Sequence, residues 1–242
     1  MIVNDNTSFE PKFNYKVWRY LDLARFLDIL NSSLLYFSRI DKFEDPYEGY
    51  VPINTKYLSK ITNVLDYMNK FCYANCWHIN DFESAALWKL YSDSRNSLAI
   101  QSTVERLKQS LQNAPERLCL SEIQYADYDN TWTKMFEITK SPNSENQFNP
   151  ATFKRISFKH ERELRIMHRT LTDPTFLQHI NEDPKTPIGE KVHCEINTLI
   201  ETVYVSPTSE AWFKNLVTSL IKRFNLEVTI IQSGLYTHVS AQ

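Results

Sequence analysis

Glycine is scarce in this sequence, which contains only Gly49, Gly189 and Gly234. A phosphate-cradling loop needs several glycines close together, because only then can backbone N–H groups reach the phosphate. The chain therefore has neither a P-loop nor a dinucleotide-binding GxGxxG motif. A bound nucleotide must be held by side chains, with arginine on its phosphates and aromatic rings against its bases.

Long apolar runs and a strong net charge are also absent. No run approaches the roughly 18 apolar residues of a transmembrane helix, and residues 1–6 lack the basic and apolar parts of a signal peptide. The formal net charge of −2 gives no broad basic field for nucleic acid or an anionic membrane. We expect a cytoplasmic protein with no membrane partner.

Cysteine is used sparingly, at positions 72, 76, 119 and 194. This number indicates reduced thiols rather than a disulfide framework. Cys72 and Cys76, with His78 close by, resemble half of a zinc site, but the other half is missing. We expect buried structural thiols and no bound metal.

The patterns that are present predict one α+β domain over residues 1–242, with a central, largely antiparallel sheet and a loosely ordered lead-in at 1–12. Strand and helix patterns intermingle without regular βα alternation. Alternation and apolar content predict strands over 15–20, 34–38, 72–78, 97–101, 123–128, 163–168, 192–196, 202–205 and 226–231. Apolar periodicity predicts helices over 23–30, 55–71, 84–91, 102–112, 153–158 and 210–224, and loops are expected at 139–150 and 172–189.

Two acidic segments, Phe43–Glu48 and Phe158–Arg165, are the main functional candidates. Pro46 restricts Asp45 to extended geometry, so the first segment should be a fixed loop. Its carboxylates, Asp45 and Glu48, either stabilise that turn or form part of a composite site with the second segment.

The second segment contains Glu161-x-Glu163-x-Arg165. On a strand these three side chains would share one face, with Leu164 and Ile166 on the opposite, buried face. One interpretation is a solvated strand edge with a salt bridge. The other is a catalytic pair, in which one glutamate hydrogen-bonds a sugar hydroxyl or stabilises positive charge and the other positions a nucleophile. Such neighbours would push their pKa values apart.

Arg19 and several aromatic residues form a third group of candidates. Arg19 would make either a buried ion pair or a phosphate clamp. Trp77, Trp88 and Tyr91 are core candidates, and one of them is also suited to stacking on a base or a nicotinamide ring.

These motifs resemble a bacterial domain-of-unknown-function family, numbered 2971, over nearly the whole chain. Phe43–Glu48 is a version of that family's Phe-Asn-Asp-Pro-Phe-Glu motif, with Glu44 in place of the usual Asn. The other matching positions are Arg19-Tyr20, Leu35–Ser38, Cys76-Trp77, Trp88, Tyr91 and Lys154-Arg155 through Glu161-x-Glu163-x-Arg165.

The order of an early basic strand residue, a helix, a second strand and a late Glu-x-Glu is also similar to the ADP-ribosyltransferase superfamily, although its Ser-Thr-Ser motif is missing. This resemblance implies that Arg19 binds the phosphates of NAD and that Tyr20 or Trp77 packs on the nicotinamide. Glu163 would hydrogen-bond the ribose as an oxocarbenium-like transition state forms, and Glu161 would orient the acceptor. Further cofactor-binding candidates are Trp88, Tyr91 and Arg165.

The leading hypothesis is an NAD-dependent glycosyl-transfer enzyme, an ADP-ribosyltransferase or NAD glycohydrolase that serves as a toxin or antiphage effector. Its partners would be a small nucleotide and a protein or nucleic-acid acceptor. One alternative is a non-enzymatic nucleotide- or protein-binding module of a bacterial defence system with a regulatory protein partner. A second is a metal-dependent nuclease that uses Asp45, Glu48, Glu161 and Glu163.

Overall fold

The computed structural model describes residues 9–50, 59–91, 96–128, 149–171 and 175–237. The chain divides into two compact units, and each is described by itself. Unit 1 contains Met1–Pro11, Tyr36–Cys76 and Pro115–Val192, and unit 2 contains Lys12–Leu35, Trp77–Ala114 and His193–Gln242. The single domain expected from the sequence stays a prediction.

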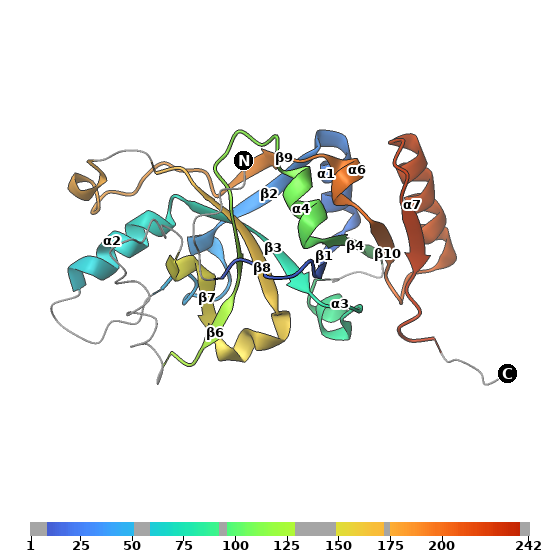
Figure 1. The fold of residues 1–242 in the computed structure, drawn as a ribbon, viewed down its shortest axis with the longest axis horizontal. Coiled ribbons are helices and arrows are strands. Elements are labelled where there is room, and N and C mark those ends of the chain that lie inside the picture. The colour runs from blue at the N-terminus through green and yellow to red at the C-terminus, as the bar shows by residue number, and fades with distance from the viewer. Residues whose placement is uncertain (1–8, 51–58, 92–95, 129–148, 172–174, 238–242) are drawn as a thin grey trace. The chain divides into compact units, whose positions relative to one another are not determined.

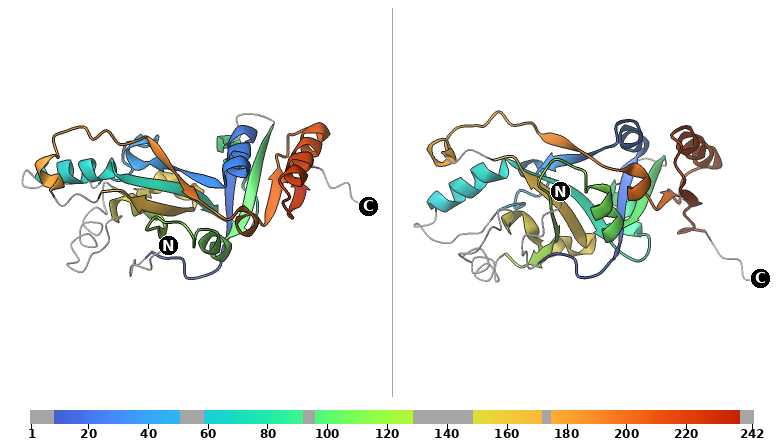
Figure 2. Two further views of the ribbon diagram at one scale, coloured as in Figure 1. Left: turned by 90° about the horizontal axis from the view of Figure 1, so that it is seen from above. Right: turned by 45° about the horizontal axis from the view of Figure 1, so that its top comes forward.

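Unit 2 is built around antiparallel pairing. Strand β1 pairs with β4 along its whole length, from Lys16 opposite Thr103 to Asp22 opposite Ser97. Strand β10 is antiparallel to β4 and parallel to β11. Figures 1 and 2 show α7 beside β10 and β11. The elements are β1 (Lys16–Asp22), α1 (Leu23–Ser32), the end of β3 (Cys72–Ile79), α3 (Ala85–Tyr91), β4 (Ser97–Thr103), α4 (Val104–Ser110), α6 (Ile196–Leu199), β10 (Thr202–Val205), α7 (Ala211–Arg223) and β11 (Thr229–Gln232).

Helix α1 begins at the predicted residue, Leu23, and continues past the predicted end at residue 30 to Ser32. The Asp22 carboxylate caps its first turn by accepting a hydrogen bond from the Arg25 backbone N–H at 2.7 Å. The helix ends at Ser33, whose φ of 56° is left-handed. Its buried face consists of Phe26, Ile29 and Leu30, which explains the apolar spacing.

Unit 1 has a mainly antiparallel sheet and a separate two-stranded parallel sheet. Strand β3 pairs with β2 and β8, β8 is antiparallel to β5, and β6 is parallel to β7. The elements are β2 (Leu34–Arg39), η1 (Ile40–Lys42), α2 (Ser59–Asn69), the start of β3, β5 (Cys119–Glu122), β6 (Gln124–Ala126), η2 (Asn149–Thr152), β7 (Phe153–Arg155), η3 (Ile156–Glu161), β8 (Glu163–Arg169), η4 (Phe176–Gln178) and β9 (Gly189–His193). The mixed α+β class with largely antiparallel pairing is confirmed.

The predicted helix at 153–158 is wrong. Phe153–Arg155 forms β7, which pairs in parallel with β6, and Ile156–Glu161 forms a 3-10 helix. The segment is short, and strand pairing outweighs local helix preference. The sequence also missed β5, which pairs with β8. The predicted loop at 139–150 lies outside the described residues except at its end.

Two expected strands differ from the observed ones in their boundaries. The expected strand at 192–196 ends at His193, and α6 begins at Ile196. The expected strand at 226–231 is a strand only over Thr229–Gln232. In the part of the chain that the structure describes, no helix is both long and apolar enough to cross a membrane.

Candidate functional site

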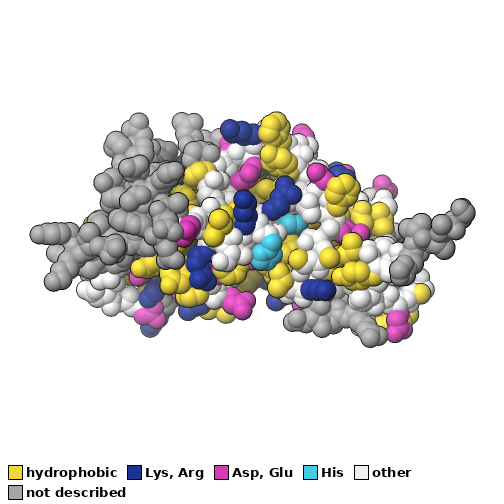
Figure 3. Space-filling view, turned by 90° about the horizontal axis from the view of Figure 1, so that it is seen from below, with side chains coloured by type: hydrophobic (Ala, Val, Ile, Leu, Met, Phe, Trp, Pro, Cys, Tyr) yellow, Lys and Arg dark blue, Asp and Glu magenta, His cyan; other side chains and the backbone are white. Residues whose placement is uncertain are grey.

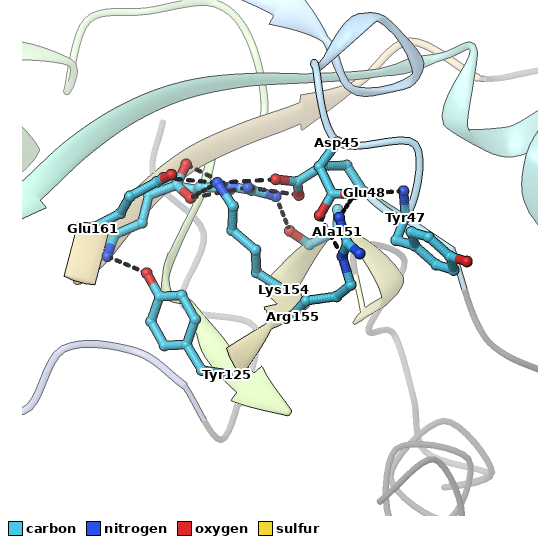
Figure 4. A network of polar contacts seen from close by, with 10 residues as sticks. Asp45, Tyr47, Glu48, Tyr125, Ala151, Lys154, Arg155 and Glu161 are labelled. Carbon is cyan, nitrogen blue, oxygen red and sulfur yellow. Dashed lines mark hydrogen bonds and ion pairs between the residues drawn. The ribbon is translucent and has the colours of Figure 1, made fainter. Parts of the chain in front are cut away.

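Figure 4 shows a buried ionic network in unit 1. Arg165 of β8 lies at its centre. Its guanidinium donates to Glu163 through Nε at 2.8 Å and Nη2 at 2.9 Å. Nη2 also donates to Glu48 Oε2 at 2.7 Å, and Nη1 donates to the Ala151 carbonyl at 2.8 Å. The Arg165 side chain is 0% exposed and that of Glu163 is 6% exposed. The interpretation of these residues as a solvated strand edge is therefore wrong.

Lys154 of β7 provides the second cation of the network. Its Nζ lies 3.1 Å from Glu48 Oε1, 2.7 Å from Glu161 Oε2 and 3.4 Å from Glu163 Oε2. One ammonium group thus serves three carboxylates. The sequence analysis did not select Lys154 as a site residue. The only signal for it was its position in the Lys154-Arg155 pair of the family resemblance.

The two acidic segments meet in unit 1. Glu48 comes from the first segment and Glu163 from the second, and both contact Arg165 and Lys154. Asp45 is held beside them by Arg155, which donates to Oδ1 at 2.8 Å and Oδ2 at 3.1 Å. We refer to Asp45, Glu48, Lys154, Arg155, Glu161, Glu163 and Arg165 as the ionic network.

The turn that carries Asp45 and Glu48 is fixed by its own backbone, as predicted. Glu48 N–H donates to the Asp45 carbonyl at 3.0 Å, and Tyr47 N–H donates to Asp45 Oδ1 at 3.1 Å. Gly49 follows with a φ of +71°, which favours glycine. Its carbonyl accepts a hydrogen bond from the buried Asn69 side chain at 2.9 Å.

Glu161 does not share the strand face of Glu163 and Arg165. It ends η3, and Arg162, with a φ of 39°, separates it from β8. This corrects the predicted three-residue face. Lys154 nevertheless holds Glu161 in the same network. Leu164 and Ile166 are both 0% exposed, as expected for the other face of β8.

The environments of the two glutamates push their pKa values in opposite directions. Burial alone would raise the pKa of Glu163, but Arg165 and Lys154 outweigh it and hold the pKa at about 2. Burial raises the pKa of Glu161 above its ordinary value, although Lys154 partly opposes the shift. Glu163 therefore stays ionised at neutral pH, whereas Glu161 takes up a proton more readily.

The candidates in unit 2 form a different arrangement. Tyr20, Trp77 and Trp88 are buried, and Tyr20 packs edge-to-face on Trp88 at 4.9 Å. The Arg19 guanidinium carbon lies 5.9 Å from the Trp77 ring centroid, which indicates a cation–π contact. Tyr91 is 48% exposed. Tyr20 and Trp88 belong to a core cluster with Trp18, Leu87 and Ala99. A cofactor-binding role for these residues stays a prediction.

The thiols and carboxylates give no metal centre within the described ranges. No group of three or more His, Cys, Asp or Glu side chains there is arranged to hold a metal ion. The four cysteines are free thiols, and three of them are buried. In the ionic network, Lys154 and Arg165 occupy the positions between carboxylates at which a cation would bind.

Comparison with known proteins adds one structural likeness. No protein-family model matches the chain, and no curated protein matches it either. The chain is similar to a solved structure of DarT from Thermus sp. 2.9 in complex with NAD+, with 8% sequence identity and a TM-score of 0.40. The likeness covers 91% of this chain and 96% of that one. A TM-score below 0.5 supports no functional inference, and membership of family 2971 stays a prediction.

Proposed function

We propose that the protein cleaves the N-glycosidic bond of NAD and transfers the ADP-ribosyl group to an acceptor or to water. The observation that carries this proposal is the Glu161–Glu163 pair. One ammonium group holds both carboxylates, yet burial raises the pKa of one and ion pairing lowers that of the other. Paired carboxylates with different pKa values are the usual catalytic groups of enzymes that cleave or transfer glycosyl groups.

The charge of the network suits a cationic transition state. Glu48, Glu161 and Glu163 pair with Lys154 and Arg165, and these five groups together carry one net negative charge when all are ionised. Cleavage of the glycosidic bond places positive charge on the ribose. A fixed negative field in a site of low dielectric would stabilise that charge, and the low pKa of Glu163 maintains it.

In this proposal Glu161 accepts the proton of the acceptor group. Its side chain is 12% exposed, against 6% for Glu163 and 2% for Glu48. In the proposed reaction the C–N bond breaks, its electron pair leaves with nicotinamide, and the acceptor oxygen bonds to C1′. The acceptor proton passes to Glu161, whose raised pKa favours this transfer.

Cationic and aromatic side chains around the pair would hold an anionic nucleotide. Arg155 lies 4.6 Å from the Tyr47 ring and 5.5 Å from the Phe158 ring. Lys159 and His160 of η3 are exposed. Figure 3 shows one face of the molecule, on which Lys, Arg and His side chains lie among acidic and hydrophobic ones. Such groups attract diphosphates and stack on rings. The cofactor-binding role that the superfamily resemblance implies for Arg19, Tyr20, Trp77, Trp88 and Tyr91 stays a separate proposal. A protein or nucleic-acid acceptor and a toxin or antiphage role stay proposals as well.

The test is nicotinamide release from NAD by the purified protein, with and without cell lysate as a source of acceptors. Glu161→Gln should lower the turnover number at least tenfold while the variant stays folded. Glu182→Gln is the matched control, because that side chain is 68% exposed and contacts His179 outside the network. Lysate-dependent release would indicate transfer, and release without lysate would indicate hydrolysis. No release by folded wild-type protein in either condition would refute the proposal.

A second candidate is a nucleotide- or protein-binding module without catalysis. The observation that favours it is that both oxygens of Glu163 already accept hydrogen bonds from Arg165 and Lys154. On this view the ionic network stabilises the fold. Glu163→Gln would then lower the stability of the protein rather than an enzymatic activity. Nucleotide binding without turnover would support this candidate.

A further inference from the structure

The hydroxyl hydrogen of Tyr125 is not donated to any of the residues that the structure describes. Tyr125 lies on β6, and its oxygen accepts a hydrogen bond from the Glu163 backbone N–H at 2.8 Å. Among the described residues, no acceptor for the hydroxyl proton lies within hydrogen-bond distance. The side chain is half-buried. A polar hydrogen that has no acceptor within the described part of the chain, beside the glutamate pair, is suited to a ligand.

The surroundings keep this hydroxyl protonated. Burial raises the pKa of Tyr125 and the negative charges of Glu163 and Glu161 raise it further, against the opposing effect of the Glu163 N–H. Figure 4 places Tyr125 at the Glu161 end of the ionic network, away from Asp45 and Tyr47. A phenolic donor and a carboxylate acceptor therefore lie at the same end of the network.

Tyr128, three residues later, provides the contrast. It is 8% exposed, and its hydroxyl has no hydrogen-bond partner among the described residues. Its ring packs on Tyr47 at 6.1 Å, at the opposite end of the network. The two tyrosines offer the same chemistry, but only Tyr125 is both accessible and adjacent to the glutamate pair.

We propose that Tyr125 donates a hydrogen bond to one ribose hydroxyl oxygen of the bound nucleotide, and that Glu161, which also takes up the acceptor proton, accepts a hydrogen bond from the neighbouring ribose hydroxyl. This rests on the proposed function, because it names a ligand-binding residue of the same site. Two neighbouring hydroxyls offer one donor and one acceptor to this pair. The arrangement selects a ribose diol over a sugar that lacks one hydroxyl, since the deoxy analogue leaves a partly buried polar group unpaired.

The experiment measures binding separately from chemistry. ADP-ribose and analogues that lack one hydroxyl of the terminal ribose are titrated by calorimetry into wild type, Tyr125→Phe and Tyr128→Phe. We expect Tyr125→Phe to weaken ADP-ribose binding by roughly three- to tenfold, as for the loss of one hydrogen bond. The wild-type protein should bind one deoxy analogue more weakly than ADP-ribose by a similar factor. Tyr125→Phe should bind that analogue almost as well as it binds ADP-ribose. Tyr128→Phe should bind as wild type does.

Several outcomes would overturn this inference. They are absence of ADP-ribose binding, equal wild-type affinity for ADP-ribose and every deoxy analogue, or an unchanged affinity in Tyr125→Phe. Should Tyr125→Phe fail to fold, the wild-type comparison of ribose with deoxyribose ligands decides. Tyr125-dependent binding without nicotinamide release would refute the catalytic proposal and keep this inference. Nicotinamide release together with binding that does not depend on Tyr125 would refute this inference and keep the catalytic proposal.

Discussion

Arg165 donates a hydrogen bond to Glu48 at 2.7 Å, across 117 positions of sequence. Their side chains are 0% and 2% exposed. This single contact joins the Asp45–Gly49 turn to β8 and brings the two acidic segments of the sequence together. The pair is therefore as much a feature of the fold of unit 1 as of its candidate chemistry.

Arg165→Met should strongly destabilise the protein. The variant leaves the buried carboxylates of Glu48 and Glu163 without their main cation, and breaking a buried ion pair costs about 3–5 kcal/mol. The free energy of unfolding in urea gives the measurement. Arg25→Met is the control, because the exposed pair of Arg25 with Asp22 at 3.6 Å should contribute at most about 1 kcal/mol. Similar losses in both variants would contradict a stabilising network.

Acid should remove stability through Glu163. Its pKa is held at about 2 in the folded protein, below the ordinary 4.5, so the folded state binds this proton less tightly than the unfolded state. The contribution of Glu163 is complete above about pH 4.5 and is lost as the pH falls toward 2. Glu161, with a raised pKa, acts in the opposite sense and favours the folded state on acidification.

The measurement is urea unfolding of wild type and Glu163→Gln from about pH 2 to about pH 7, a range that includes the titration of carboxylates. The wild-type free energy of unfolding should fall between pH 4.5 and pH 2, and the variant should show a shallower fall. Identical slopes would mean that Glu163 is not an ionised partner of Arg165.

Gly49→Ala should destabilise unit 1 and disturb the ionic network. A Cβ at this position would lie 2.7 Å from the Asn69 side-chain nitrogen, and the φ of +71° strains any other residue. We expect a loss of about 1–3 kcal/mol. Gly234→Ala is the matched control, because a Cβ there meets nothing within 4 Å. Thermal unfolding compares the two, and equal melting temperatures would show that the turn adapts.

EDTA should leave nicotinamide release unchanged. The proposed chemistry uses fixed side-chain charges, and the Lys154 ammonium group occupies the position between the carboxylates at which a metal ion would otherwise bind. The assay is repeated in excess EDTA and again with added Mg²⁺ or Mn²⁺. Loss of activity on chelation and its recovery with metal would favour a metal-dependent mechanism, including the nuclease alternative.

Local patterns predicted most elements of the fold. The apolar spacing of Phe26 and Leu30, with Asp22 as a cap, predicted α1, and Glu163–His168 was recognised as a strand. The failures share a cause. β5 and β7 exist because each pairs with a strand distant in sequence, and local preference carries no information about such partners.

For the site, the scarcity of glycine excludes glycine-loop nucleotide folds, and the sequence motifs indicate Asp45, Glu48, Glu161, Glu163 and Arg165 as candidates. The folded structure is needed to show that these residues meet, that Lys154 joins them and that Tyr125 lies beside them. Burial and long-range ion pairs set the charge state of each glutamate, and both depend on contacts between residues far apart in the chain.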